Sequence, residues 1–291
     1  MKLKFFALAL VAFAAVVGAN PDPEVFYQAH RGGLAEVPEN TMAAFRHAWS
    51  CPGAVPEVDI RTTRDNVFVC LHDETPSRTT NAPPDFEHKK ISAIDCDTVR
   101  QWDAGSWFAP KFAGEKVPLL TEVFEEIKGR PKRLIYLDAK HVDLDLLAAL
   151  VCEYGLNEQV IFTHEDPELG QAFKEKVAGA QSMTWLSGPP VLIKSRFRKL
   201  AEKKFGGVDQ LQLHLKAART TPEIVYALDE EFLHQAIEKT RGAGVQLQLR
   251  PFQFDPQSLR PLIDAGVRWF VTDEPRRFSE ALAKALAAPG P

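Results

Sequence analysis

From residue 119 to its end, the chain alternates short apolar runs typical of strands with longer amphipathic runs typical of helices. Strands joined by helices run parallel, because a helical crossover returns the chain to the same end of the sheet. With two earlier strands, the pattern gives eight parallel strands, each followed by a helix. It predicts an α/β fold, a (β/α)8 TIM barrel, with an open doubly wound sheet as the alternative. The strands are expected to end near His30, Asp59, Leu137, Phe162, Trp185, Leu213, Leu249 and Val271.

The segment 75–118 interrupts this alternation and has a different composition, with two adjacent prolines and several aromatic residues. Loops of this length in a compact domain usually have a function. We therefore interpret it as a small lid-like insertion after the second strand, with one helix at 93–102. The first helix of the chain is expected at 40–49, with Asn40 as its N-cap. The later helices are expected at 119–128, 144–154, 167–177, 192–204, 229–241, 256–265 and 278–288.

The first 19 residues do not fit the domain. Lys2 and Lys4 precede the apolar run Phe5–Val17, which is too short to span a bilayer comfortably and ends in small residues. We expect residues 1–19 to be a secretory signal peptide, with an uncleaved anchor as the alternative. Residues 20–291 are expected to form one domain of a secreted or periplasmic protein. No later segment is apolar for long enough to span a membrane.

Charge and cysteine content narrow the possible partners. A formal net charge of −4 gives no basic footprint, so nucleic acid is not an expected partner. The cysteines lack metal-site spacing, and in an oxidising compartment they either form a disulfide or remain thiols. The pattern leaves both possibilities open for Cys51, Cys70, Cys96 and Cys152.

Near the second strand, the chain turns back on itself. The apolar runs Val55–Ile60 and Val67–Leu71 are too close in sequence for a helical crossover, so they must pair antiparallel. Folding about the turn places His72 roughly opposite Asp59. Side chains two apart on a strand, such as Glu57 and Asp59, point to the same side. Carboxylates inside a buried sheet need compensation, most simply from a divalent cation such as Ca²⁺ or Mg²⁺.

Further polar residues follow the other strands, at the end of a barrel where active sites lie. The whole set suits a phosphodiester: a metal ion neutralises a phosphoryl oxygen, and two fixed cations share the remaining charge. Two histidines exchange protons with the nucleophile and the leaving alkoxide near neutral pH. The candidate metal ligands are Glu57, Asp59 and Asp138, the acid/base pair is His30 and His72, and the phosphate-binding residues are Arg31 and Lys140.

In these residues, the sequence resembles the glycerophosphodiester phosphodiesterase family. His30-Arg31-Gly32 with Pro38-Glu39-Asn40-Thr41 is similar to its first motif, and Glu57-x-Asp59 with His72-Asp73 and Arg78-Thr79-Thr80 to its second. Asp103–Phe108 resembles its insertion, and Thr272–Pro275 its closing strand. The resemblance implies a TIM-barrel enzyme that cleaves small glycerophosphodiesters to glycerol 3-phosphate and an alcohol with Ca²⁺ or Mg²⁺. It implies the same roles for the seven residues named above.

Three positions depart from the family pattern. Asp138 stands where the family usually has Glu, so its reach is shorter. Asn66 replaces a turn glycine, a change that Asn tolerates at positive φ. Arg250 lies near the end of a strand that lacks the usual Trp and Asn, which leaves the alcohol preference open.

Two other functions remain possible from the sequence. One is a phospholipase D-type reaction on lysophospholipids or other phosphodiesters, which could yield a cyclic phosphate. The other is a non-catalytic binder of phosphorylated ligands, although such a binder has little need for two histidines and three carboxylates. The choice between water and a substrate hydroxyl as the nucleophile, the metal and the oligomeric state are also open.

Overall fold

The computed structural model describes residues 25–287. Its main sheet contains eight parallel strands, as the alternation predicts, and a ninth strand on one of them. The eight are β1 (Phe26–Ala29), β2 (Ala54–Thr62), β4 (Ile135–His141), β5 (Val160–Thr163), β6 (Gln181–Leu186), β7 (Gln210–Leu215), β10 (Gln246–Pro251) and β11 (Trp269–Thr272).

The sheet closes on itself. β1 pairs parallel with β11 on one side and with β2 on the other, so the order runs β1-β11-β10-β7-β6-β5-β4-β2 and returns to β1. The predicted (β/α)8 barrel is therefore correct, and the open sheet is excluded. Closure brings the carboxyl ends of all eight strands to one face.

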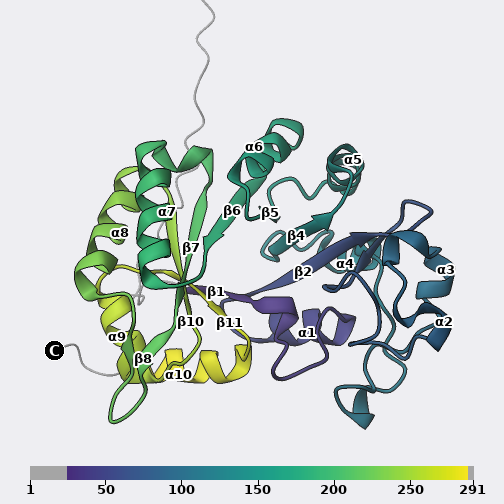
Figure 1. The fold of residues 1–291 in the computed structure, drawn as a ribbon, viewed down its shortest axis with the longest axis horizontal. Coiled ribbons are helices and arrows are strands. Elements are labelled where there is room, and N and C mark those ends of the chain that lie inside the picture. The colour runs from purple at the N-terminus through teal and green to yellow at the C-terminus, as the bar shows by residue number, and fades with distance from the viewer. Residues whose placement is uncertain (1–24, 288–291) are drawn as a thin grey trace, which may run out of the picture.

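Helices follow the strands around the barrel, with α7, α8 and α9 at the opposite end of the molecule from the insertion (Figure 1). Several begin at aspartates whose side chains accept hydrogen bonds from first-turn N–H groups, for example Asp143, Asp166 and Asp229. These caps explain why the predicted helix starts lie close to those observed. The helices are α1 (Met42–Ser50), α4 (Leu120–Ile127), α5 (Leu144–Tyr154), α6 (Pro167–Lys176), α7 (Pro190–Glu202), α8 (Glu230–Gly242), α9 (Pro256–Asp264) and α10 (Pro275–Ala287).

The ninth strand, β3 (Phe68–Cys70), pairs antiparallel with β2, as predicted. Ile60 is opposite Cys70, and the Leu71 N–H donates to Asp59 O (3.0 Å). His72 therefore lies one residue past the position opposite Asp59. Asn66, in the turn, has a φ of 61°, the left-handed conformation expected of a residue that replaces glycine.

The insertion has a small apolar core of its own, built around Val99 and Trp102 and continued by Leu71 of the hairpin. Its predicted helix at 93–102 is shorter than expected, because Ile94 and Asp95 are extended and the helix covers only Cys96–Val99. Ile94 is extended because its carbonyl accepts a hydrogen bond from the Arg64 N–H (3.0 Å), which is distant in sequence. Only short helical pieces remain: α2 (Pro84–Glu87), η2 (Ile91–Ala93), α3 (Cys96–Val99) and η3 (Pro110–Phe112).

Two more features were not predicted. A small hairpin, β8 (Ala217–Arg219) with β9 (Val225–Tyr226), lies between β7 and α8. The barrel interior also contains a buried polar network, in which the Tyr136 hydroxyl donates to Gln210 (2.7 Å) and accepts from Gln248 (3.1 Å). The remaining short elements are η1 (His30–Gly32) and η4 (Lys204–Gly207).

All four cysteines lie within the described residues and none is joined to another, so of the two possibilities the thiols are the one observed. Among residues 25–287, no helix is both long and apolar enough to cross a membrane. The predicted signal peptide, residues 1–19, lies outside the described part of the chain.

Candidate active site

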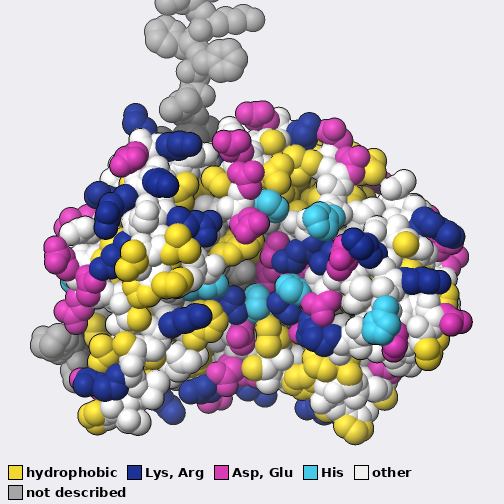
Figure 2. Space-filling view, in the orientation of Figure 1, with side chains coloured by type: hydrophobic (Ala, Val, Ile, Leu, Met, Phe, Trp, Pro, Cys, Tyr) yellow, Lys and Arg dark blue, Asp and Glu magenta, His cyan; other side chains and the backbone are white. Residues whose placement is uncertain are grey.

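Charged side chains and histidines gather around a hollow near the middle of one face of the molecule (Figure 2). The candidate metal ligands meet at the carboxyl ends of two neighbouring strands. Glu57 and Asp59 come from β2, and Asp138 lies directly opposite Asp59 on β4. One carboxylate oxygen from each of the three lies within 4.8 Å of the others. The predicted cluster is therefore assembled, and the shorter Asp138 side chain still reaches it.

The acid cluster holds more negative charge than its surroundings neutralise. Burial, followed by the charges of Asp59 and Asp138, raises the pKa of Glu57 well above its usual range. Burial also raises the pKa of Asp138 to about 6, against the opposing effect of Lys140. Asp59 is equally buried, but Lys140, His72 and Arg31 together lower its pKa. Burial, mutual repulsion and the nearby cations therefore separate the pKa values of the three carboxylates.

The cluster fits a hard divalent cation by two observations. Asp59 Oδ1 is buried and accepts no hydrogen bond within residues 25–287, although Lys140 Nζ lies 2.9 Å away. All three donors are carboxylate oxygens, the ligands that Ca²⁺ and Mg²⁺ prefer. Glu57, Asp59 and Asp138 could therefore hold such an ion together.

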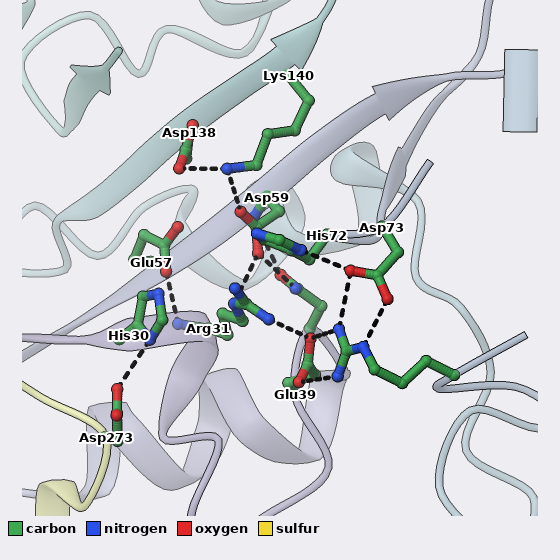
Figure 3. Close-up of polar contacts among 12 residues, drawn as sticks. His30, Arg31, Glu39, Glu57, Asp59, His72, Asp73, Asp138, Lys140 and Asp273 are labelled. Atoms are coloured by element: carbon green, nitrogen blue, oxygen red, sulfur yellow. Dashed lines mark hydrogen bonds and ion pairs between the residues drawn. The ribbon is translucent and has the colours of Figure 1, made fainter. Parts of the chain in front are cut away.

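Lys140 lies between two of the carboxylates. Its Nζ is 2.6 Å from Asp138 Oδ2 and 2.9 Å from Asp59 Oδ1 (Figure 3). Burial opposes the charged form, but Asp59 and Asp138 raise the pKa of Lys140 above its ordinary value. It therefore stays an ammonium group at neutral pH, beside the cluster.

Arg31 occupies an unusual backbone position, with a φ of 52°. This turn directs its N–H to Glu57 Oε2 (2.5 Å) and its guanidinium to Glu39 (2.9 Å) and toward Asp59 (3.5 Å). Its Nε is buried and makes no hydrogen bond to any described residue. The guanidinium therefore keeps one donor available in the site.

Asn40 is not the N-cap of α1, contrary to the prediction. Thr41 has that role, because its Oγ1 accepts from the Ala44 N–H (3.2 Å). Asn40, at a φ of 54°, donates instead to Asp59 Oδ2 (2.7 Å) and accepts from the Asp59 N–H (3.0 Å). These two hydrogen bonds fix the central carboxylate of the cluster.

His30 is held by residues at the ends of β11, the strand next to β1, and of β10. Its Nδ1 lies 2.8 Å from Asp273 Oδ1, and Arg250 Nη2 lies 2.9 Å from both atoms. Because the Asp273 carboxylate, with its pKa lowered to about 2, can only accept, we assign an Nδ1–H that donates to it, which leaves Nε2 as the acceptor. Burial and then Arg250 lower the pKa of His30 to about 4, so the ring is neutral at pH 7.

His72 has a similar support within the hairpin and insertion. Its Nδ1 lies 2.7 Å from Asp73 Oδ1, and Arg78 bridges Asp73 and Glu39. The second ring nitrogen of each histidine points into the space around the acid cluster (Figure 3). The two imidazoles thus approach the cluster from different sides.

Sequence reasoning assigned no role to Asp273, Glu39 or Asp73, although each belongs to a quoted motif. Asp273 follows the last strand directly. The rule that active-site residues of a barrel lie at the carboxyl ends of its strands, here called the strand-end rule, could therefore have identified it. Two polar residues near the end of β7 have different surroundings. Gln212 is buried in the interior network, whereas His214 lies beside Arg250 and Phe252.

The fold and site together define a class: a barrel hydrolase of phosphoric diesters, with its charged groups at the carboxyl ends of the strands. The comparisons identify the family. The model of the glycerophosphoryl diester phosphodiesterase family matches residues 30–277. The chain belongs to this family.

Individual relatives agree with that assignment. A glycerophosphodiester phosphodiesterase of Caldanaerobacter subterraneus subsp. tengcongensis is 37% identical over 262 residues, which are 88% of this chain and 97% of the relative. The fold resembles that of a glycerophosphodiester phosphodiesterase from Agrobacterium tumefaciens, with a TM-score of 0.68 at 23% identity over 88% of this chain and 99% of the other. It also resembles an Oleispira antarctica phosphodiesterase solved with the product sn-glycerol-3-phosphate, with a TM-score of 0.65 at 21% identity over 89% and 96%.

Proposed function

We propose that this protein is a metal-dependent enzyme that hydrolyses glycerophosphodiesters to glycerol 3-phosphate and an alcohol. The observation that carries the proposal is a buried cluster of three carboxylates flanked by two cations and two carboxylate-held imidazoles. The name of the Caldanaerobacter relative and the product bound to the Oleispira enzyme support the same reaction.

Glu57, Asp59 and Asp138 are the proposed ligands of a Ca²⁺ or Mg²⁺ ion, supported by the three carboxylate oxygens that lie within 4.8 Å of one another. When bound, the ion would supply positive charge to a phosphoryl oxygen. Arg31 and Lys140 are proposed to bind the other phosphoryl oxygens. Their guanidinium and ammonium groups stabilise the charge that develops as the diester is attacked.

His30 is the proposed base. Its ring is neutral at pH 7 because its pKa is lowered, and its Nε2 lone pair can take a proton from the attacking hydroxyl. His72 is then the proposed acid, which gives a proton to the leaving alkoxide. Asp273 and Asp73 hold the two rings in the tautomer and orientation that these transfers need.

Release of glycerol 3-phosphate from glycerophosphocholine tests the proposal. We expect turnover that EDTA abolishes and that Ca²⁺ or Mg²⁺ restores. His30→Ala and His72→Ala should each lower kcat/KM by about 10²- to 10⁴-fold. His88→Ala is the matched control, because His88 is strongly exposed in the insertion and should not affect the rate. Unchanged turnover after metal removal and in both histidine variants would exclude the mechanism.

A second substrate class is favoured by the end of β10. Arg250 contacts His30 there and lies over the Phe252 ring, and the two residues would suit a lysophospholipid or another phosphodiester with a different alcohol. Hydrolysis of a glycerophosphodiester would release glycerol 3-phosphate, whereas a phospholipase D-type reaction on these other substrates could yield a cyclic phosphate. Phosphorus NMR of the products distinguishes the two, because these compounds have different chemical shifts.

Export is also proposed, from Lys2, Lys4 and the apolar run that follows. Amino-terminal sequencing of the protein recovered from the medium or periplasm tests it. A mature amino terminus close to residue 20 is expected, whereas an intact Met1 in the cytosol would exclude the signal peptide.

A further inference from the structure

The inward-facing side chains of β7 and β10 form a second polar wall at the carboxyl end of the barrel. Gln210 and Gln212 of β7 belong to the interior network, so strand alternation directs His214, two residues further on, to the same side. On β10, Gln248 and Arg250 are related in the same way, and Arg250 is the register partner of His214. His214 and Arg250 therefore follow the network at the end of the barrel that holds the acid cluster.

This wall faces the acid cluster across the barrel (Figure 1). In the closed order of strands, three strands separate β7 from β2 in either direction, and three separate β10 from β4. The cluster itself lies on β2 and β4. A phosphodiester bound at the cluster would thus extend toward His214 with the ester group that points away from β2 and β4.

The interior network fixes the tautomer of His214. The Gln212 Nε2 group donates to Gln248 Oε1 (3.1 Å), so we assign the Gln212 oxygen to the side of His214. His214 Nε2 lies 3.1 Å from this oxygen, which can only accept, and Nε2 therefore carries the proton. The Gln248 amide in turn donates to the Tyr136 hydroxyl (3.1 Å), and this hydroxyl donates to Gln210 (2.7 Å). Donors and acceptors thus alternate along the network up to His214.

The other ring nitrogen of His214, Nδ1, is left as a hydrogen-bond acceptor. Burial, followed by the charge of Arg250, lowers the pKa of His214 to about 3, so the ring is neutral at pH 7 and Nδ1 keeps its lone pair. No residue within 25–287 donates a hydrogen bond to Nδ1, and solvent can reach the atom. The ring also packs edge-on against Phe252, with 5.3 Å between ring centroids. A neutral acceptor held in this way suits a hydroxyl group of a ligand.

The positions of the two acid/base histidines decide which part of the substrate reaches this wall, and this step rests on the proposed function. His72, the proposed acid, follows β3, which pairs with β2, so the leaving alcohol lies on that side. His30, the proposed base, contacts Arg250 of the wall (2.9 Å). The glycerol, which keeps its phosphate, therefore extends past His30 toward His214.

We propose that His214 Nδ1 accepts a hydrogen bond from the terminal hydroxyl of the glycerol and thereby selects substrates whose glycerol is not acylated. The hydroxyl on C2 is next to the ester carbon and stays close to the phosphorus, whereas the hydroxyl on C1 extends beyond it. An acyl chain on C1 removes the donor and leaves Nδ1 without a partner, which weakens binding. Gln212 is then a positioning residue, because it acts on the substrate only through His214.

Matched substrates and variants test this pairing. We compare kcat/KM on glycerophosphocholine and on its 1-deoxy analogue, in which a methyl group replaces the terminal CH₂OH. Wild type should prefer glycerophosphocholine by about tenfold or more, because the analogue leaves the acceptor unpaired. His214→Phe should lose this preference through a lower rate on glycerophosphocholine, with little change on the analogue. His214→Asn, whose amide oxygen can lie near the position of Nδ1, should recover part of it.

His164→Phe is the matched control, because His164 also follows a barrel strand but its Nδ1 already accepts from the Asp166 N–H (3.0 Å). This variant should keep the wild-type preference. If His214 had only a structural role, His214→Phe would lower both rates equally and leave the preference unchanged, and that outcome would overturn the proposal. A wild-type enzyme that turns over both substrates equally well would also overturn it.

Nitrogen NMR of the full chain with labelled histidine gives a measurement that does not depend on turnover, with the His214 signals assigned from His214→Phe. At pH 7 we expect the Nε2–H tautomer and a shift of the Nδ1 signal when glycerol 3-phosphate is added. The Nδ1–H tautomer, or an Nδ1 signal unchanged at saturating ligand, would overturn the proposal. A protein without turnover on either diester would contradict the proposed function, and the NMR result would still decide the role of His214.

Discussion

Each imidazole of the site is held by an aspartate and an arginine, but the two sets of partners lie at very different distances along the sequence. His72 is held by Asp73, its neighbour in sequence, and Arg78 completes the arrangement within the same segment. His30 is held by Asp273, 243 residues away, and by Arg250 from β10. The first arrangement, the His72 arm, is local. The second, the His30 arm, exists only when β1 and β11 close the barrel. The His30 side chain is less exposed than that of His72 (17% against 32%), whereas Asp273 and Asp73 are similarly exposed (33% and 28%).

The comparison shows what burial adds to a His–Asp pair. On the His30 arm, the weakly exposed imidazole and Arg250 share the Asp273 carboxylate, so the loss of that carboxylate is poorly compensated. On the His72 arm, solvent and a second carboxylate, Glu39, remain available to Arg78. Equivalent substitutions should therefore have larger effects on the His30 arm.

The largest difference is expected between Asp273→Asn and Asp73→Asn. The amide introduced by Asp273→Asn would favour the wrong His30 tautomer and leave Arg250 without its carboxylate, which should lower kcat/KM by about 10²- to 10³-fold. Asp73→Asn should cost about tenfold, since Arg78 keeps Glu39. Steady-state kinetics on glycerophosphocholine measure both. Equal losses would mean that burial does not distinguish the arms.

Stability against pH should also report the His30 arm. The pKa of His30 is about 4 in the folded protein and about 6.5 in an unfolded chain, so the unfolded state binds more protons between these values. The contribution of His30 to the free energy of unfolding is therefore complete above pH 6.5 and is lost as the pH falls through 4. The total change in the free energy of unfolding is up to about 3 kcal/mol. Denaturant unfolding at several pH values measures it. His30→Gln should flatten this dependence, and a profile as steep as wild type would refute the assignment.

The smallest effect is expected from the arginines. Arg250→Gln removes a positive charge that lowers the pKa of His30, so that pKa should rise. The acid limb of the kcat/KM profile should then move to higher pH, with a several-fold loss near pH 5. Arg78→Gln is the control, because Arg78 contacts the other arm. An acid limb that moves in Arg78→Gln but not in Arg250→Gln would reverse the comparison.

Local patterns in the sequence predicted much of this architecture. Helix starts were found because aspartate caps act within one turn, and the Glu57–Asp59 pair because strand alternation is local. Features that depend on distant contacts were not found. The 93–102 helix is shorter than predicted, with Ile94 extended where its carbonyl accepts a hydrogen bond from the distant Arg64 N–H. The hairpin of β8 and β9 has no local sequence pattern that distinguishes it from a loop. The glutamine network inside the barrel likewise has none that distinguishes it from ordinary packing between strands.

The site shows the same division. Asn40 has the residue type of an N-cap, and only the fold shows that Thr41 caps the helix while Asn40 holds Asp59. Asp273 could be located at a strand end from the sequence, but its partner could not. The seven predicted residues were brought together because the strand-end rule depends on the fold class alone. The residues that hold these seven in place could not be predicted, because their contacts depend on which loops meet in the closed barrel.

Glu39 has a consequence for how this fold can be altered. Its buried carboxylate is shared by Arg31 of the first loop and Arg78 of the insertion. The insertion is thus not a separable module that starts at residue 75, because its first arginine depends on a residue contributed before β2. Any chimera that exchanges this insertion with that of a relative must exchange residue 39 with it, or it will leave an unmatched charge beside Arg31.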